Sequence, residues 1–386
     1  MSYNLHVMQL LPTLRTGGAE RLVADLSVAL KAAGVRVTLV TMFPEEQTPN
    51  EKRINAAAIP RYSLGKRLGL DLRMFARIYR LMQKLKPDVL HAHLYSLRYA
   101  IPAIILNRST AAVYTVHSIP SKEDKLLALH LYRLAFRYRL VQPVAVSPSI
   151  ASYSRAYYGT SIAFPVIPNG IQLAVFACTP RPVCSTRKRV VFLNVGRLVD
   201  VKNQAFLLRV ARKLKDAGVD FELRIAGEGP LRQSLEEQAR YLCLQSRVRF
   251  LGVMPEMAPV YSSADIFVLP SLHEGLPVSL LEAMAARLAV VASAVGGIPD
   301  VVHHGRTGLL LPPRDEELWV AALQRLVADV RLREELAEAG HAEVVGRYDI
   351  ESAARAYLQV YESLVRAEPT TFGAGPSQRS RTESGL

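Results

Sequence analysis

Cysteine is scarce in this chain: its 386 residues include three, at Cys178, Cys184 and Cys243. The number is odd and the spacing does not match that of metal ligands, so the cysteines make neither a disulfide framework nor a thiolate metal site. Free thiols are typical of proteins that stay in a reducing cytosol. The cysteine pattern therefore favours an intracellular protein over a secreted one.

Long hydrophobic runs are also missing. No uninterrupted apolar stretch reaches the roughly 18 residues that a bilayer-spanning helix needs. Residues 1–18 contain only a short apolar stretch with no basic segment before it, so they do not resemble a secretory signal. Apolar stretches such as residues 101–106 fit buried strands or helix faces instead. We therefore expect a cytoplasmic protein without a membrane-spanning segment.

The composition excludes a disordered or fibrous protein, because half of the residues are apolar and 21% are charged. The net charge of +14 is unevenly distributed. Residues 1–175 carry 22 Lys and Arg against 9 Asp and Glu, a net charge of +13, whereas residues 176–386 carry 26 against 25, a net charge of +1. The excess predicts an anionic partner for the first half: nucleic acid, an anionic membrane or a phosphorylated lipid.

Apolar runs of strand length alternate with helical patterns, which favours parallel sheets with helices on both faces. We expect strands at residues 4–11, 35–42, 88–93, 112–117 and 143–147, and again at 189–195, 221–226, 248–251, 265–270, 289–293 and 308–311. A strand, a glycine-bearing turn and a helix open both halves. The sequence therefore predicts two doubly wound, Rossmann-like α/β domains facing a cleft, with ligands at the carboxyl ends of the strands.

The predicted domains comprise residues 1–175 and residues 176–349. Residues 173–188 contain two prolines and few periodic positions, so we interpret them as the linker. Three further segments complete this organisation: one helix over residues 315–345, a last helix over 350–366 that packs back on the first domain, and a disordered tail over 367–386.

The most informative motif lies in residues 271–284, where seven residues separate Glu274 from Glu282. The preceding strand delivers Glu274 to the carboxyl edge of its sheet, and Gly275 allows close backbone approach to a ligand. Pro277 suits the first turn of a helix, whose N-terminus attracts an anion such as a diphosphate. Glu282 lies further along that helix, where it can accept hydrogen bonds from vicinal hydroxyls. By spacing alone, both glutamates could also be surface residues at an ordinary strand–helix turn.

This segment resembles the E-x7-E motif of the retaining glycosyltransferases of family 4, which have the two-domain GT-B fold. Five more segments match that family in the right order: Gly17–Glu20, Ile167–Ile171, Gly196–Asn203, Gly227–Pro230 and Gly296–Asp300. Each is short and weak by itself, whereas six in order form a specific signal. The matches cover most of the predicted folded chain.

The resemblance implies that residues 176–349 bind a nucleotide-sugar donor and that residues 1–175 lie on the acceptor side. The residues implied in donor binding are Gly17, Gly18, Gly196, Arg197, Lys202, Gly227, Gly275, Leu276, Pro277, Val278 and Glu282. Arg197 and Lys202 would stabilise the negative charge that grows on the leaving diphosphate, although they could also form a solvated basic turn. His117 and Glu274 are implied as catalytic residues near the reacting carbon of the sugar. His117 could otherwise be a loop histidine without a role.

No Asp-x-Asp pair occurs in the sequence, although many sugar-nucleotide transferases use that pair to hold a divalent ion. With Arg197 and Lys202 present, this absence predicts a site without metal, and no cofactor is expected. His91 and His93 alternate along a strand end without an evident third ligand, so we interpret them as structural or cleft-lining. The Gly17-Gly18 turn lacks the G-x-G-x-x-G spacing of a dinucleotide site, which argues against a dehydrogenase.

A basic helix is expected over residues 65–86. Its apolar face would comprise Leu68, Leu72, Phe75, Tyr79 and Met82, and its basic stripe Arg73, Arg77, Arg80 and Lys84. The helix could be a core helix with a solvated face, or its stripe could dock on an anionic membrane surface or a polyprenyl diphosphate. Interleaved aromatics that could stack on bases are lacking from the stripe, so no nucleic-acid partner is expected.

These observations predict a retaining glycosyltransferase that acts in the cytoplasm, peripherally on the inner face of the membrane. It would transfer a sugar from a UDP- or GDP-sugar to a glycan or a polyprenyl-diphosphate-linked acceptor in bacterial exopolysaccharide, capsule or lipopolysaccharide synthesis. The family resemblance implies a front-face displacement, because no carboxylate is placed as a covalent nucleophile. Two alternatives remain open: a sugar-nucleotide epimerase of the same fold, and a non-catalytic basic protein that binds membrane or nucleic acid.

Overall fold

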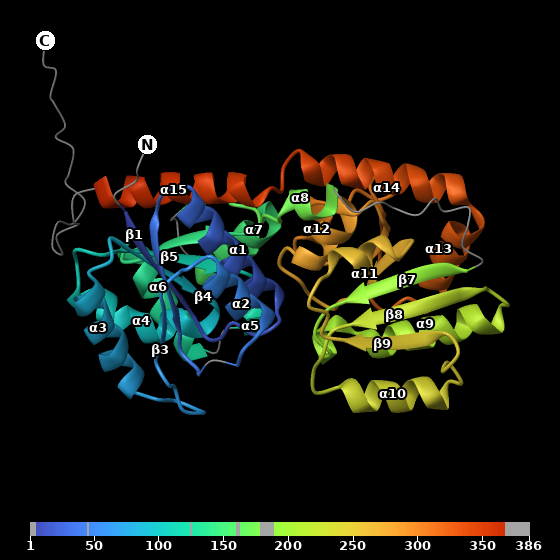
Figure 1. Ribbon diagram of the computed structural model, residues 1–386, viewed down its shortest axis with the longest axis horizontal. Helices are drawn as coiled ribbons and strands as arrows, with labels where there is room; N and C mark the ends of the chain where they lie inside the picture. Colours follow the sequence, from blue (N-terminus) through green and yellow to red (C-terminus); the bar gives the residue numbers. More distant parts are fainter. Residues whose placement is uncertain (1–4, 45, 124–125, 160–162, 178–188, 367–386) are drawn as a thin grey trace, which may run out of the picture.

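The computed structural model describes residues 5–44, 46–123, 126–159, 163–177 and 189–366 (Figure 1). The predicted tail, most of the predicted linker, Cys178 and Cys184 lie outside the described residues. Two six-stranded sheets, one in each half of the chain, form the framework. Every pair of neighbouring strands in both sheets is parallel. The predicted fold class is therefore confirmed.

The first sheet has the order β3-β2-β1-β4-β5-β6. Its strands are β1 (His6–Leu11), β2 (Arg36–Thr41), β3 (Arg61–Ser63), β4 (Val89–His93), β5 (Ala111–Val116) and β6 (Gln142–Ala145). The second sheet has the order β12-β11-β10-β7-β8-β9. Its strands are β7 (Val190–Val195), β8 (Phe221–Ala226), β9 (Val248–Gly252), β10 (Ile266–Leu269), β11 (Ala289–Ser293) and β12 (Leu309–Leu311). The central strands are buried along their length because helices cover both faces.

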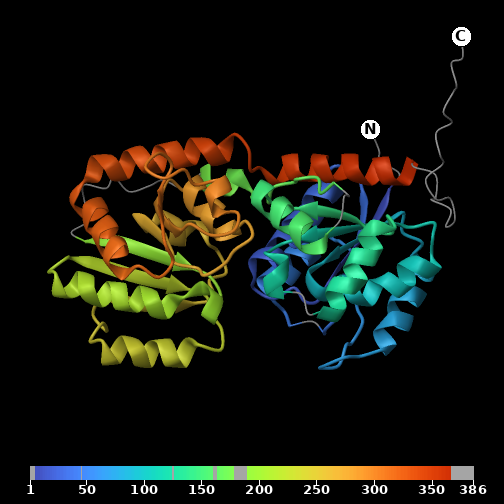
Figure 2. The same cartoon turned by 180° about the vertical axis from the view of Figure 1, so that it is seen from behind.

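Helices surround both sheets (Figures 1 and 2). Those of the first half are α1 (Gly18–Ala32), α2 (Pro49–Ala56), α3 (Arg73–Leu85), α4 (Leu97–Leu106), α5 (Pro120–Glu123), α6 (Leu126–Arg137) and α7 (Pro148–Tyr158). Those of the second half are α9 (Gln204–Asp216), α10 (Arg232–Tyr241), α11 (Ala258–Ser262), α12 (Val278–Ala285), α13 (Glu316–Ala328) and α14 (Val330–Val345). Two helices connect the halves, α8 (Leu173–Ala177) and α15 (Ile350–Arg366). Among the described helices, none is both long and apolar enough to cross a bilayer.

The chain passes between the halves twice, first after α8 and again before α15. After the second passage, α15 packs on the first domain against α1 and β5 (Figure 1). The two crossings lie side by side, because the Ile350 amide donates to the Ile171 carbonyl at 3.0 Å. A Cβ atom on Gly170 would lie 2.5 Å from the Cα atom of Ile350, so glycine allows this approach. One hydrophobic cluster includes buried residues of both domains, among them Leu26 of α1 and Leu280 of α12. The domains therefore share apolar packing as well as hydrogen bonds.

Two helical predictions were wrong in extent. The helix expected over residues 65–86 begins only at Arg73, because Gly65 and Gly69 have φ angles of +59° and +78°, in the left-handed region. The helix expected over 315–345 is two helices, because Asp329 adopts an extended conformation and its carboxylate caps the amide of Leu332. The predicted linker begins with α8, and β3 is a strand that was not expected.

Candidate active site

The residues predicted to bind the donor follow the carboxyl ends of strands in both sheets. In the first sheet, Gly17 and Gly18 follow β1, and His117 follows β5. In the second sheet, the segment from Gly196 follows β7, Gly227 follows β8 and the segment from Glu274 follows β10. In a doubly wound sheet, ligands bind at this edge. The two edges meet where α1 contacts α12, so the predicted residues of both domains surround the same region.

Lys202 and Glu274, 72 positions apart in sequence, are paired in the structure. The Lys202 ammonium donates to the Glu274 carboxylate at 2.5 Å, and the side chains are 19% and 10% exposed. The Ser271 hydroxyl donates to the same carboxylate oxygen at 2.7 Å. Ser271 and Lys202 therefore fix the orientation of Glu274 through one of its two carboxylate oxygens.

The other cation of the predicted phosphate loop, Arg197, is exposed, and its charge lowers the pKa of Glu20 in part against the larger, raising effect of burial. Its backbone is fixed, since its carbonyl accepts from the Gln204 side chain at 3.0 Å. Beside it, Gly227 has a φ of +137°, and a Cβ atom there would lie 2.0 Å from the Gly196 carbonyl oxygen. These glycines allow the loops after β7 and β8 to touch, and so hold the Arg197 loop in place.

Two helix N-termini face each other across the domain junction. Helix α1 begins at Gly18 and α12 at Val278, and an added Cβ atom on Gly18 would lie 3.9 Å from the Val278 side chain. Pro277, which the sequence predicted for the first turn of this helix, is its N-cap residue, one position before the first turn. Free N–H groups and the positive ends of two helix dipoles attract anions. Together with Arg197 and Lys202 they make this region suited to a diphosphate.

Gly275 meets the other domain at the junction. A Cβ atom at this position would lie 1.8 Å from the carbonyl oxygen of His117. The sequence predicted that Gly275 lets backbone amides approach a ligand, whereas the contact that the structure shows at Gly275 is with the other domain. Within the second domain, Gly296 makes a similar close contact with the residue before Gly275. A Cβ atom on Gly296 would lie 1.8 Å from the Glu274 carbonyl oxygen. Glycines thus set the separation between Glu274 and His117.

Glu282 is buried in the structure, 6% exposed, with its carboxylate held on two sides. The Tyr261 hydroxyl donates to it at 2.9 Å, and the Arg21 guanidinium of the first domain lies 3.8 Å away. Burial raises the pKa of Glu282, and Arg21 and the Tyr261 hydrogen bond lower it in part. Any hydroxyl bound by Glu282 would therefore meet a carboxylate that is already oriented by both domains.

His117 continues a chain of hydrogen bonds that runs into the first domain. Its Nε2 lies 3.0 Å from Nδ1 of His93, and Nε2 of His93 lies 2.7 Å from the Gln9 side-chain oxygen. The neighbouring His91 bonds instead to the hydroxyls of Tyr361 and Thr115, each at 2.7 Å. Thus His91 and His93 bind protein groups, and no group of three or more potential metal ligands occurs among the described residues.

Burial lowers the pKa of His117 to about 4, from an ordinary value of 6.5. Burial also lowers the pKa of His91 and His93 well below that value, with a smaller effect from the neighbouring imidazoles. The three imidazoles are therefore neutral at pH 7, and each carries one ring proton. The Nδ1 atom of His117 is buried and has no hydrogen-bond partner in the described structure.

We expect the stability of this protein to fall as the pH falls from about 6.5 to about 4. In that range the unfolded chain binds a proton on residue 117 that the folded chain does not, so folding becomes less favourable. For His117 alone the loss at pH 5 would be up to about 2 kcal/mol. Unfolding midpoints measured at pH 7.5 and pH 5 should differ less in His117→Gln than in the wild type; an equal difference would contradict the assignment.

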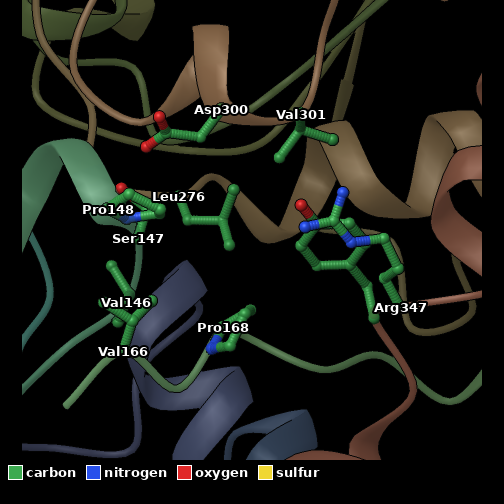
Figure 3. A pocket seen from close by; sticks show the side chains of 10 residues that line it. Val146, Ser147, Pro148, Val166, Pro168, Leu276, Asp300, Val301 and Arg347 are labelled. Carbon is green, nitrogen blue, oxygen red and sulfur yellow. The ribbon is translucent and has the colours of Figure 1, made fainter.

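A cavity of about 260 Å³ lies at the seam between the domains (Figure 3). Its lining includes Ser147, Pro168, Leu276, Asp300 and Arg347, and Leu276 is its only lining residue that the sequence predicted to bind the donor. On one side of the cavity the Asp300 carboxylate accepts from the Ser149 amide and hydroxyl, at 3.0 and 2.8 Å. This contact caps the N-terminus of α7 from the other domain. It therefore helps to hold the domains together.

Two of the four cations predicted to form the basic stripe on α3 are bonded to other groups of the protein. Arg73 pairs with Asp71 at 2.9 Å, and Arg77 donates to the carbonyl oxygens of Leu64 and Gly65. Arg80 and Lys84 are exposed. The residues buried by α3 are Met74, Ile78, Leu81 and Met82, of which the predicted apolar face included only Met82. Leu68 and Leu72, placed on that face by the prediction, are exposed instead.

Sequence reasoning missed several side chains that orient the site. Arg21 follows the matched Gly17–Glu20 segment directly, and Ser271 precedes Glu274 by three positions, so both were within reach of motif analysis. Tyr261 and Gln9 lie on a separate helix and strand, and no local pattern marks them. Their roles depend on contacts that only the folded chain makes.

Comparison with known proteins places the chain in a family. A family model described as Glycosyltransferase Family 4 matches residues 16–175, and one described as Glycosyl transferases group 1 matches residues 189–329. The chain belongs to the group 1, family 4 glycosyltransferases. It is 35% identical over 196 residues to a D-inositol 3-phosphate glycosyltransferase of Corynebacterium urealyticum, covering 48% of this chain and 45% of that protein.

A second relative is the lipopolysaccharide core biosynthesis glycosyltransferase LpsE of Rhizobium meliloti, 34% identical over 45% of this chain and 50% of the relative. The chain therefore spans about half the length of these relatives. Among solved structures, Anabaena HepE in complex with UDP-glucose has a TM-score of 0.80 at 19% identity, covering 94% of this chain and all of that one. At this identity, the likeness shows that this family 4 chain and HepE share a fold.

Proposed function

We propose that this chain is a retaining glycosyltransferase that transfers a sugar from a nucleotide-sugar donor. The observation that carries the proposal is the Lys202–Glu274 pair at the carboxyl edge of the second sheet, in contact through Gly275 with His117 of the first domain. This arrangement places a cation, a carboxylate and a neutral imidazole around one region. Family membership supports the same reaction class.

The donor would bind with its diphosphate between the N-termini of α1 and α12, near Arg197 and Lys202. These groups supply fixed positive charge where negative charge grows on the leaving diphosphate. Glu282 would accept hydrogen bonds from the ribose hydroxyls. HepE, which has the same fold, was solved with UDP-glucose, and this supports a UDP-sugar as donor. Because side chains and helix termini supply the charge, we propose that no metal ion is required.

The proposed step is a front-face displacement. The acceptor oxygen forms a bond to the anomeric carbon on the same face from which the donor phosphate leaves, and the acceptor proton passes to the leaving phosphate oxygen. The configuration at the anomeric carbon is then retained. Glu274 would hold hydroxyls of the donor sugar and stabilise the positive charge that develops near its ring, while His117 contacts the sugar from the first domain.

The acceptor is proposed to be a glycan or a polyprenyl-diphosphate-linked sugar used in a bacterial surface polysaccharide. The relative LpsE, named for lipopolysaccharide core biosynthesis, supports this class. We propose further that the protein acts in the cytoplasm, on the inner face of the membrane, where the net charge of +13 over residues 1–175 favours an anionic surface.

A donor screen with the wild-type protein tests the proposal. UDP-, GDP- and ADP-sugars are incubated with the protein without acceptor, with and without EDTA, and both thermal stabilisation and sugar release are measured. We expect sugars of one nucleotide class to stabilise the protein and to be slowly hydrolysed, to the same extent with and without EDTA. Formation of an epimer would instead favour the epimerase. Absence of stabilisation and of turnover for every donor would contradict the proposed function.

A further inference from the structure

Three leucines are exposed in residues 65–72, which belong to the segment between β3 and α3, and we refer to these residues as the leucine loop. Leu68 is 92% exposed, Leu70 75% and Leu72 62%. They are spaced two residues apart, so three large apolar side chains are concentrated within five positions. Single exposed leucines are common on protein surfaces, whereas a group of this kind marks an interaction site.

The backbone of the leucine loop is held firmly. The buried Lys66 ammonium donates to the carbonyl oxygens of Arg67 and Gly69, at 2.9 and 2.5 Å. The buried Asp71 carboxylate accepts from the Arg67 amide at 3.1 Å and from the Arg73 guanidinium at 2.9 Å. The polar side chains of Lys66 and Asp71 thus turn inward to hold the backbone, and the leucines point outward. This is the reverse of the usual division between core and surface.

Positive charge surrounds the leucine loop. Residues 61–86 contain eight Lys and Arg against one acidic residue, Asp71, which is buried. Arg67, Arg80 and Lys84 are exposed. A protein partner would need a complementary acidic surface with an apolar pocket, whereas an anionic bilayer presents both features everywhere. The combination of exposed leucines and cations is suited to the boundary between headgroups and acyl chains.

The position of the loop fits the proposed reaction. It follows the carboxyl end of β3, and therefore lies at the same edge of the first sheet as Gly17 and His117. Figure 1 shows the chain between β3 and α3 at the lower border of the first domain, on the side away from α15. A bilayer touching this border would hold a lipid-linked acceptor near the edge of the sheet that faces the cleft.

We propose that the leucine loop inserts into the surface of an anionic membrane, with Leu68, Leu70 and Leu72 entering the apolar boundary and the exposed cations of the loop and α3 contacting lipid phosphates. The inference rests on the proposed membrane association and deepens it. It assigns the apolar contact to the loop and leaves Arg73 and Arg77 to hold the loop in place.

Vesicle flotation tests this assignment. Full-length protein is floated with phosphatidylcholine vesicles that contain about one-third phosphatidylglycerol, and with phosphatidylcholine alone. We expect the triple variant Leu68→Ser, Leu70→Ser, Leu72→Ser to bind the anionic vesicles about 30-fold more weakly than the wild type. The matched control is Leu106→Ser, a leucine 67% exposed at the end of α4, at the opposite edge of the sheet, and it should bind as the wild type does.

Fluorescence gives a second measurement that does not depend on affinity. The only tryptophan, Trp319, is fully buried in the second domain, so Leu70→Trp adds a reporter whose emission should shift to the blue on anionic vesicles. Equal binding of the triple variant and the wild type, or an unshifted emission of the introduced indole on bound protein, would overturn the insertion. Wild-type protein that binds neither vesicle would overturn the membrane association as well, whereas donor hydrolysis tests the transferase function separately.

A second inference concerns the protonation of His117 and is carried by the buried chain Gln9–His93–His117. The Gln9 side-chain oxygen can only accept, so Nε2 of His93 carries the proton of that ring. Because His93 is neutral, its Nδ1 accepts, and the proton between the two rings belongs to Nε2 of His117. The buried Nδ1 of His117 is then an acceptor with a free lone pair.

The geometry points to Gln9 and His93 as positioning residues that hold His117 in its Nε2–H form, so that Nδ1 accepts a hydrogen bond from a hydroxyl of the donor sugar. This inference rests on the proposed function for the identity of the ligand. In the other tautomer Nδ1 would carry the proton and would donate to the sugar. The bound hydroxyl would then have to accept a hydrogen bond from His117 instead of donating one.

The test combines histidine ¹⁵N NMR with kinetics in the wild type, Gln9→Leu and Tyr357→Phe, with the His117 signals identified by their loss in His117→Gln. We expect an unprotonated Nδ1 in the wild type and in Tyr357→Phe, which removes a buried hydroxyl bonded to Thr115 and leaves the hydrogen bonds of Gln9 and His93 in place. In Gln9→Leu both tautomers should appear, and kcat for transfer should fall about tenfold with little change in KM for the donor.

The spectra do not depend on turnover, so they separate this inference from the proposed function. A protonated Nδ1 on His117 in the wild type would overturn the tautomer. Unchanged His117 signals in folded Gln9→Leu, or an equal loss of kcat in Gln9→Leu and Tyr357→Phe, would overturn the positioning role and leave Gln9 a structural residue.

Discussion

Replacing Glu274 with glutamine should lower the rate of sugar transfer by about 10²–10³-fold, the usual cost of removing one group that stabilises developing charge. The amide has the same shape as the carboxylate and can still accept from Ser271 and Lys202, so the local structure should remain. The substitution removes the negative charge that faces the donor sugar. Because Lys202 loses its anionic partner, its ammonium becomes more available to the diphosphate, and KM for the donor should stay unchanged or fall.

The matched control is Glu317→Gln, because Glu317 also accepts from a lysine, Lys213, at 2.5 Å, but on the exposed surface of the second domain. Surface pairs of this kind contribute little, so this variant should retain wild-type kcat. Steady-state kinetics with the donor class found in the screen measure both variants. A Glu274→Gln enzyme with a kcat near that of the wild type would show that Glu274 does not act on the reacting sugar.

The architecture was predictable because parallel strands buried on both faces appear as continuous apolar runs, such as residues 189–195 and 265–270. The missed strand β3 is three residues long, begins with Arg61 and lies at the sheet edge. None of its residues is fully buried, so its sequence has no apolar run that would predict a strand. The start of α3 lies later than predicted because Leu68 and Leu72, although at helical spacing, are exposed residues of a loop that contains Gly65 and Gly69. Those glycines adopt left-handed conformations that a helix does not tolerate.

The site was predictable to the extent that topology determines it. Lys202 and Glu274 follow different strands, and the rule that carboxyl ends share one edge was enough to expect them near each other. The contact of Gly275 with His117, and that of Arg21 with Glu282, depend on how the domains close, which no local pattern encodes. Sequence analysis therefore identified groups within each domain, and the structure was needed to find the pairs between them.

The contact at Gly275 leads to the second large effect. Gly275→Ala should lower transfer by at least about 100-fold, because misplacing reacting groups by about 1 Å has an effect of this size. The new Cβ atom would lie 1.8 Å from the His117 carbonyl oxygen, a distance that no relaxed contact allows. The atoms that the new methyl group would meet are backbone atoms of His117 and Ser118, which no side-chain rotation can move, so we expect the domains to move apart. Small-angle scattering should then show a larger radius of gyration than that of the wild type.

Gly346→Ala is the control for adding a methyl group near the domain junction. Gly346 has an ordinary φ of −75°, and a Cβ atom there would lie 3.6 Å from the Ala342 carbonyl oxygen, a normal contact. We expect this variant to keep both the wild-type dimensions and the wild-type rate. If Gly275→Ala were as compact and as active as the wild type, closure through Gly275 could not be the contact that brings His117 to Glu274. If it were compact but inactive, Gly275 would act on the bound donor, as the sequence alone predicted, rather than on the separation of the domains.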